Sequence, residues 1–147
     1  MKTIFWIRSE GDNMLAQISI YTENKKGAAR EIMGILANKD INILNLVSSD
    51  SGEFGTMRLL VSDTDMAIEE LRRNNYLCRR DSVIATELED KPGSLEMFLS
   101  HIEKVNINIS YLYVGYIRET KTPVIVMHCD DIGIVEQNLK SNGFKVF

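Results

Sequence analysis

The sequence predicts an α+β fold made of two copies of one βαββαβ unit, within a chain of 147 residues. The first observation is a repeated motif, because Glu23-Asn24-Lys25-Lys26-Gly27 recurs 66 residues later as Glu89-Asp90-Lys91-Pro92-Gly93. The second is that each copy is followed at the same spacing by Ile-Asn-Ile, at residues 41–43 and 107–109. A repeat of this length exceeds a solenoid unit and matches a small domain, so we predict a duplicated domain.

The elements of the first half follow from hydrophobic periodicity, which alternates in strands and recurs every three to four residues in helices. Asp63-Thr64-Asp65 supplies N-cap candidates for the second helix. The predicted order is strand 14–22, helix 27–38, strand 41–47, a turn over 48–55, strand 56–61, a helix after Asp65, and strand 77–80.

The second half repeats this order. It reads as strand 83–88, helix 94–105, strands 109–117 and 123–129, helix 131–141, and strand 144–147. Each half therefore has the ferredoxin-like order, in which two helices cover one face of an antiparallel sheet. No linker rich in Gly, Pro or Ser separates the halves, so we predict domains at 14–80 and 81–147, packed side by side with a continuous antiparallel sheet.

Residues 1–13 have no counterpart in the second copy. The apolar run Ile4-Phe5-Trp6-Ile7 predicts an extra edge strand or an interface, and the alternative is an extension from an upstream start codon.

Composition is typical of a globular protein, with 44% hydrophobic and 26% charged residues. No apolar run approaches the roughly 18 residues of a membrane span, and no signal-peptide pattern is present, so we expect a cytoplasmic protein without a membrane partner. The net charge of −4 argues against a nucleic-acid partner. Cys78 and Cys129 read as buried thiols, and His101 and His128 lack companions at ligand spacing, so we expect no metal and no cofactor.

The repeated loop favours binding of an α-amino acid. A helix that begins at Gly27 or Gly93 presents unpaired N–H donors and the positive end of its dipole to a carboxylate. Glycine also lets the ligand approach the backbone closely. Asn24 or Asp90 offers an oxygen to an ammonium group, as do the asparagines of the Ile-Asn-Ile motifs. The alternative is purely structural: a turn and helix cap, and an Asn that bonds its own backbone.

The first motif, the helix, Ile-Asn-Ile and the strand Met57-Arg58-Leu59-Leu60-Val61 resemble the ACT domain. This family consists of small regulatory modules that bind amino acids and control metabolic enzymes. The closest motif resemblance is to the serine-binding regulatory domain of phosphoglycerate dehydrogenase, where two asparagines contact the ligand across a domain interface. The resemblance implies that Asn24, Asn42 and the Gly27 backbone hold the polar ends of a ligand.

Departures from the family pattern limit what carries over. Asp90 replaces the first asparagine in the second copy, and Lys26 replaces the proline in the first. Neither copy has the preceding histidine, since Thr22 and Leu88 stand there, so serine is not implied as the ligand. The two sites are therefore expected to be unequal. The predicted ligand-binding residues are Asn24, Lys26, Gly27, Ala28, Asn42, Ser48, Asp90, Pro92, Gly93, Ser94, Asn108, Tyr113 and Val114.

We predict a regulatory protein and not an enzyme, since Gly-x-Ser-x-Gly, Walker and Gly-x-Gly-x-x-Gly motifs are missing from the sequence. It would sense an amino acid at the interface of its two ACT domains and act on a separate enzyme or regulator, with a homodimer among the assemblies allowed. One alternative is a ligand-free interaction or oligomerisation module. RNA binding is less favoured, because Tyr111 and Tyr113 lack counterparts in the first copy and the basic pairs Arg72-Arg73 and Arg79-Arg80 are too few.

Overall fold

The computed structural model describes residues 14–147, so the edge strand predicted within residues 1–13 lies outside the described residues. The chain divides into two compact units. We call Ala16–Asp81 the first unit, and the second unit comprises Ser82–Phe147 together with the start of the chain up to Leu15. Within the described residues, no helix is long and apolar enough to cross a membrane.

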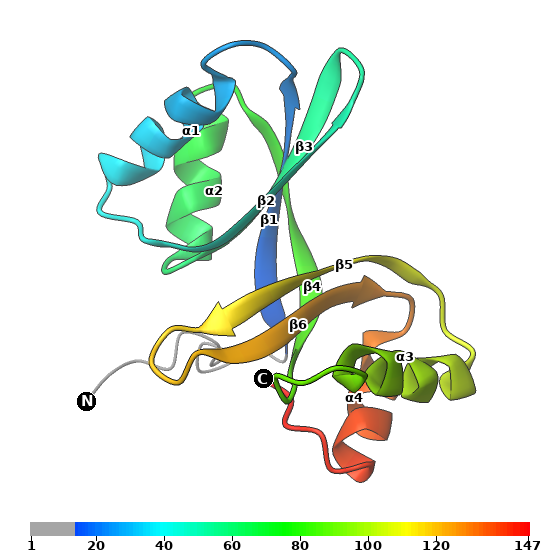
Figure 1. Cartoon of the computed structure of the whole chain (residues 1–147). Helices are drawn as coiled ribbons and strands as arrows, with labels where there is room; N and C mark the ends of the chain where they lie inside the picture. Colours follow the sequence, from blue (N-terminus) through cyan, green and yellow to red (C-terminus); the bar gives the residue numbers. More distant parts are fainter. Residues whose placement is uncertain (1–13) are drawn as a thin grey trace. The chain divides into compact units, whose positions relative to one another are not determined.

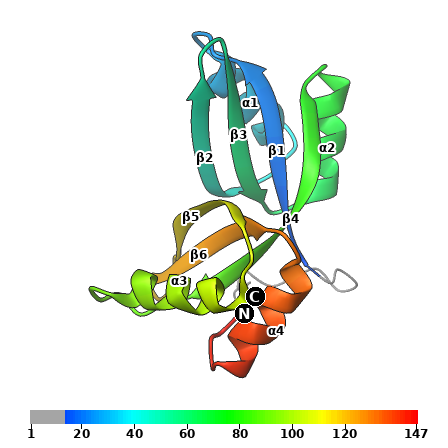
Figure 2. The ribbon, with the colours of Figure 1, turned by 90° about the vertical axis from the view of Figure 1, so that its right-hand side faces the viewer.

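The helices of the first unit lie on one face of its strands (Figures 1 and 2). Its elements are β1 (Leu15–Glu23), α1 (Ala28–Ala37), β2 (Ile43–Ser51), β3 (Phe54–Val61), α2 (Thr64–Arg73) and the start of β4 (Leu77–Glu87). The strand order is β2-β3-β1-β4, which leaves β2 at the outer edge. Fully buried aliphatic side chains from strands and helices, such as Ile18, Ile32 and Leu71, form its core.

The second unit has the same plan, with α3 and α4 on one face of its strands (Figures 1 and 2). It comprises the end of β4, α3 (Ser94–Val105), β5 (Ile109–Ile117), β6 (Thr122–Cys129) and α4 (Ile132–Ser141). The order β4-β6-β5 leaves β5 at the outer edge. Phe98, Ile102 and Met127 are among its fully buried core residues.

The predicted fold class is confirmed, since two βαββαβ units follow one another and the β1–β3, β2–β3, β4–β6 and β5–β6 pairs are antiparallel. The bounds predicted for α3 and β5 agree with the structure. Of the three N-cap candidates for the second helix, Asp63 is the cap, because its side chain accepts a hydrogen bond from the Met66 amide at 3.0 Å.

Three predicted elements differ from the structure by more than the one or two residues seen at other element ends. The turn predicted over 48–55 is much shorter, because β2 extends to Ser51 and β3 begins at Phe54, with Gly52 at φ 83° between them. The polar residues of this segment are exposed on the outer strand, where only backbone pairing with β3 is needed. The final strand 144–147 is reduced to one bridge, between Val146 and Thr86.

The third error concerns β4, which runs without interruption through the predicted boundary between strands 77–80 and 83–88. The polar pair Asp81-Ser82 breaks the apolar pattern in the sequence, but in the structure Asp81 is only 7% exposed. Its carboxylate accepts hydrogen bonds from Ser19 Oγ at 2.5 Å and from Arg79 Nε at 2.6 Å. These bonds satisfy the buried charge and let the strand continue.

Cys129 provides a prediction about alkaline stability. Burial, with Asp130 and Asp131 as secondary causes, raises the pKa of its thiol from 9.0 to about 11. Because the folded pKa lies above the unfolded one, the thiol's contribution to stability is complete below about pH 9 and is lost as pH rises towards 11. Urea titrations at pH 8 and pH 10.5 should show a larger loss of unfolding free energy for the natural protein than for Cys129→Ala. Equal losses in the two proteins would contradict this assignment.

Candidate functional site

The two repeated loops share one backbone geometry at the start of α1 and α3. Gly27 and Gly93 each have φ 88°, a left-handed conformation that favours glycine, and neither helix has a side-chain cap. The flanking hydrogen bonds also match, since the amides of Ala28 and Ser94 donate to the carbonyls of Lys25 and Lys91 at 3.3 Å. The next two N–H groups of each helix, on residues 29 and 30 of α1 and residues 95 and 96 of α3, make no such bond within residues 14–147 and are available to an anionic group.

The residue before each loop differs in its hydrogen bonding. Asn24 is tied to the β2–β3 hairpin, because its amide N donates to Glu53 O at 2.7 Å and its Nδ2 donates to Gly52 O at 3.1 Å. Its Oδ1 remains as an acceptor. Asp90 is exposed and its carboxylate makes no hydrogen bond or ion pair within residues 14–147. The second loop thus offers a full negative charge to a cation, and the first offers only a neutral amide oxygen.

Ser94 distinguishes the second loop further. It occupies the first position of α3, is 5% exposed, and its Oγ has no hydrogen-bond partner among the described residues. The equivalent position of α1 is Ala28, which has no polar side-chain atom. A buried hydroxyl without a hydrogen-bond partner lowers the stability of the fold. A ligand or a water molecule at the loop would supply the missing hydrogen bond. The repeat places Ser94 directly after the second loop, but only the structure shows that its side chain is buried.

The two asparagines of the Ile-Asn-Ile motifs lie far from the loops of their own units. Glu23 of β1 and Ser51 of β2 both pair with Phe54, whereas Ile43, next to Asn42, pairs with Val61 at the other end of β3. Seven residues of strand separate those positions, a span of about 24 Å. Asn108 likewise precedes β5 at the end where Ile109 pairs with Cys129, while Glu87 pairs with Val124 near the loop end.

Both asparagines are held by hydrogen bonds to their backbone groups, and their side chains stay available to a ligand. The Asn42 amide donates to Ser62 Oγ at 2.9 Å, and the Asp130 amide donates to Asn108 O at 3.2 Å. Neither side-chain amide makes a hydrogen bond within residues 14–147. Asn24 and Asn42 are therefore both exposed, but one unit by itself does not bring them to a common ligand.

The remaining predicted residues are distributed over loops and outer strands. Lys26 and Pro92 are exposed in the loops. Ser48 is exposed on β2, and on β5 Tyr113 is buried and Val114 is 45% exposed. Because Tyr113 and Val114 are consecutive in a strand, they point to opposite faces, and only one of them can contact a given ligand.

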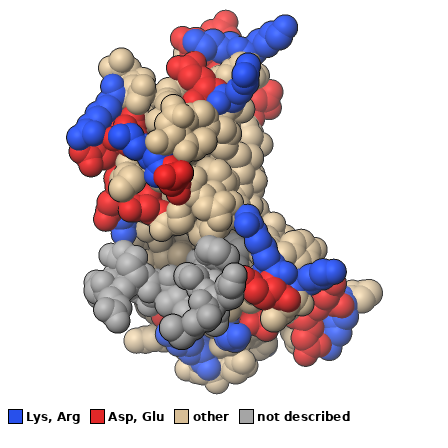
Figure 3. Space-filling view, turned by 90° about the vertical axis from the view of Figure 1, so that its left-hand side faces the viewer, with Lys and Arg blue, Asp and Glu red and all other residues tan. Residues whose placement is uncertain are grey.

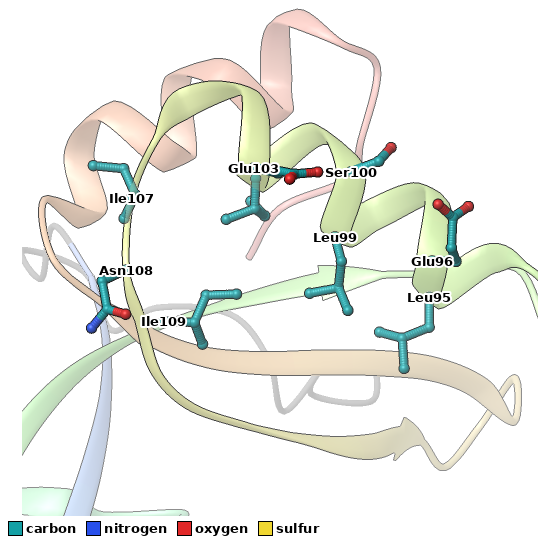
Figure 4. Close-up of a pocket in the computed structure, with 9 residues that line it drawn as sticks. Leu95, Glu96, Leu99, Ser100, Glu103, Ile107, Asn108 and Ile109 are labelled. Atoms are coloured by element: carbon teal, nitrogen blue, oxygen red, sulfur yellow. The ribbon is translucent and has the colours of Figure 1, made fainter.

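A groove in the second unit was not predicted from the sequence. A hollow of about 730 Å³ lies between α3 and the start of β5. Figure 4 shows Leu95 and Leu99 directed from α3 towards the strands, with Glu96 and Glu103 on the outer side of the helix. The lining residues are Leu95, Glu96, Leu99, Ser100, Ile102, Glu103, Ile107, Asn108 and Ile109. One sequence signal could have indicated this groove: Leu95 and Leu99 are four residues apart and lie beside the helix face that carries Phe98.

A second hollow of about 630 Å³, in the first unit, is lined by Arg72, Arg73, Arg80, Asp65, Ile68 and Glu69. Its arginines already have partners. Arg73 pairs with Glu69 and Glu70, Arg80 with Asp65 at 2.5 Å, and Arg72 donates to Cys78 O at 3.3 Å. It is therefore not an open anion site.

Surface charge gives little support to RNA binding. Figure 3 shows Lys and Arg interspersed with Asp and Glu on the face that it draws. Tyr111 stacks on His128 with ring centroids 5.2 Å apart, and Tyr113 is buried. RNA-recognition modules of this topology need exposed aromatics beside basic residues.

Comparisons with known proteins agree with this architecture. A family profile described as an ACT domain pair matches residues 13–139. Protein BT0572 from Bacteroides thetaiotaomicron is 25% identical, with 91% of this chain and 92% of that chain covered and a TM-score of 0.84. No curated protein sequence matches the chain.

Two further similar structures are regulatory subunits of aspartate kinase. The one from Thermus thermophilus is 12% identical over 88% of this chain and 93% of that chain, with a TM-score of 0.63. The one from Thermus flavus is 14% identical over 88% and 90% of the two chains, with a TM-score of 0.65. At this identity the similarity establishes a shared fold.

Proposed function

The chain belongs to the family of ACT domain pairs, and from this membership we propose that it is a regulatory protein that binds a free amino acid and acts on a separate partner protein. The observation that carries the proposal is the pair of uncapped helix starts at Gly27 and Gly93. The regulatory role of the two Thermus subunits supports it, since they belong to an enzyme of amino-acid metabolism.

A zwitterionic amino acid matches the chemistry of each loop. Its carboxylate would accept hydrogen bonds from first-turn N–H groups of α1 or α3, where the helix dipole also favours a negative charge. Its ammonium group would donate to Asn24 Oδ1 or to the Asp90 carboxylate. We propose that the second loop binds more tightly, because Asp90 carries a full charge without a partner and Ser94 supplies a hydroxyl.

Asn42 and Asn108 would complete a site only beside a loop from another ACT domain, because each lies at the far end of its own sheet. Ligand binding would then stabilise the contact between the domains that share it. A change in that contact is the means by which the ligand would influence a partner.

Thermal melts with each common amino acid at millimolar concentration test the proposal. A ligand present at 100 times its dissociation constant adds about 2.7 kcal/mol of stability. For a chain of 147 residues this raises Tm by roughly 5–10 °C. Absence of a shift with every amino acid would refute ligand binding and favour the ligand-free interaction module.

Variants then locate the site. Asp90→Ala should remove most of the shift, and Asn42→Ala and Asn108→Ala should each reduce it, because each removes an oxygen that accepts from the ammonium group. Gln137→Ala, an exposed amide on α4, is the matched control and should leave the shift intact. If the shift persists in all three variants, the amino acid binds elsewhere.

A further inference from the structure

Two exposed apolar side chains of β5 lie on the face of the second unit's sheet that carries α3. Val114 is 45% exposed and Tyr116 is 55% exposed. They share a face with Leu112, because alternate residues of a strand point the same way, and Leu112 packs on the core that contains residues of α3. Val114 also pairs directly with Ile125, which belongs to that core. Both exposed side chains therefore point to the helix layer.

Strand pairing places these side chains at the same end of the unit as the second loop. The Leu88 amide, directly before the loop, donates to Pro123 O at 2.9 Å, and Pro123 pairs with Tyr116. Two strand spacings, about 10 Å, therefore separate Leu88 from Tyr116, which is close enough for a bound amino acid to bridge. Leu95, in the first turn of α3, is 38% exposed and is directed towards the strands (Figure 4). We call Leu95, Val114 and Tyr116 the apolar wall.

The apolar wall begins at the residues whose backbone can bind an anion. The N–H groups of Leu95 and Glu96 make no backbone hydrogen bond within residues 14–147, and Leu95 also contributes its side chain to the wall. Ser94, just before them, is 5% exposed, and its Oγ has no hydrogen-bond partner in the described part of the chain. A carboxylate bound to these amides is therefore one residue away from apolar surface.

Small or polar residues flank the first loop instead. Shifted by the 66-residue repeat, the three positions of the apolar wall are occupied by Ala29, Ser48 and Asp50, which are all exposed. The structural equivalence holds, because Ser48 pairs with Met57 of the first core just as the wall residue of β5 pairs with the second core. Three positions that are distant in sequence thus change together, from small or polar to large and apolar.

We propose that the second loop is selective for amino acids with a large apolar side chain, such as leucine or phenylalanine, and that the first loop is not. This inference rests on the proposed function and adds the class of ligand to it. The ligand's carboxylate accepts from the Leu95 and Glu96 amides, its ammonium group meets Asp90, and its side chain lies against the apolar wall. Removing both apolar surfaces from water provides the selectivity.

Isothermal titration calorimetry with leucine and asparagine, which have nearly the same shape, tests the selectivity. The natural protein should bind leucine at least about tenfold more tightly than asparagine. Leu95→Ala/Val114→Ser/Tyr116→Ser removes the apolar wall without adding charge. In this variant the affinity for leucine should fall to within about threefold of that for asparagine, because the apolar side chain then gains no buried contact.

Ile134→Ser is the matched control. It removes an apolar side chain that is 47% exposed on α4, which follows the Cys129 end of β6 and so begins away from the loop. This variant should keep the preference for leucine, and circular dichroism verifies that each variant is folded.

The outcomes separate this inference from the proposed function. If no amino acid binds the natural protein, both are overturned. If leucine and asparagine bind equally well, or if the preference survives loss of the apolar wall, amino-acid binding stands and the selectivity of the second loop is overturned.

Discussion

Phe98→Ala is expected to lower the free energy of unfolding by about 3–5 kcal/mol, the usual cost of removing a buried aromatic ring. Phe98 is fully buried in the core of the second unit and meets Phe144 edge-to-face, with ring centroids 5.8 Å apart. The loss combines the transfer free energy of the ring with the cavity left beneath α3. Urea titration followed by circular dichroism measures it.

Met97→Ala, at the adjacent α3 position, provides the control. Met97 is 46% exposed, so its truncation should change stability by less than about 0.5 kcal/mol. Phe98→Leu keeps most of the apolar volume and should cost less than Phe98→Ala. If Phe98→Ala cost as little as Met97→Ala, the ring would not be the centre of this core.

The second large effect is expected for Asp81→Ala, which should cost about 2–3 kcal/mol. The substitution leaves the Ser19 hydroxyl, on a residue only 1% exposed, without its acceptor, and it removes the ion pair that Asp81 forms with Arg79. We place the loss below the 3–5 kcal/mol of a fully buried ion pair because the Arg79 side chain is 57% exposed.

Asp81→Asn keeps one oxygen acceptor and should lose less than half as much. A double-mutant cycle with Ser19→Ala separates the hydrogen bond from the rest, and a coupling of about 1 kcal/mol is expected for residues in direct contact. Additive effects of the two substitutions would show that the hydrogen bond between Ser19 and Asp81 contributes nothing.

Helix and strand bounds could be predicted from the sequence where they depend on the pattern of neighbouring residues alone. The bounds of α3 and β5 agree because a buried helix face and a continuous apolar strand each leave a clear periodic pattern. The length of β4 was missed because Asp81-Ser82 reads as a break, and only the side chains of Ser19 and Arg79 show that Asp81 is accommodated. Exposed polar residues concealed the end of β2 in the same way, since an outer strand needs no apolar alternation.

For the candidate site, the repeat identifies the loops but not how they are used. That Asn24 bonds Gly52 while Asp90 is unpartnered depends on contacts with residues distant in sequence. The 18-residue spacing of Asn24 and Asn42 gives no sign that the strands place them at opposite ends of the sheet.

Because β4 is uninterrupted, the segment that joins the two halves should not tolerate insertions. Successive residues of a strand face opposite sides, so inserting one residue after Asp81 would exchange the two faces for the remainder of β4, from Ser82 to Glu87. Ile84 would turn away from the core that it now shares with Phe98. Insertion scanning should therefore find the boundary between the duplicated halves as intolerant as a core strand, whereas the exposed hairpin at Gly52 should accept extra residues.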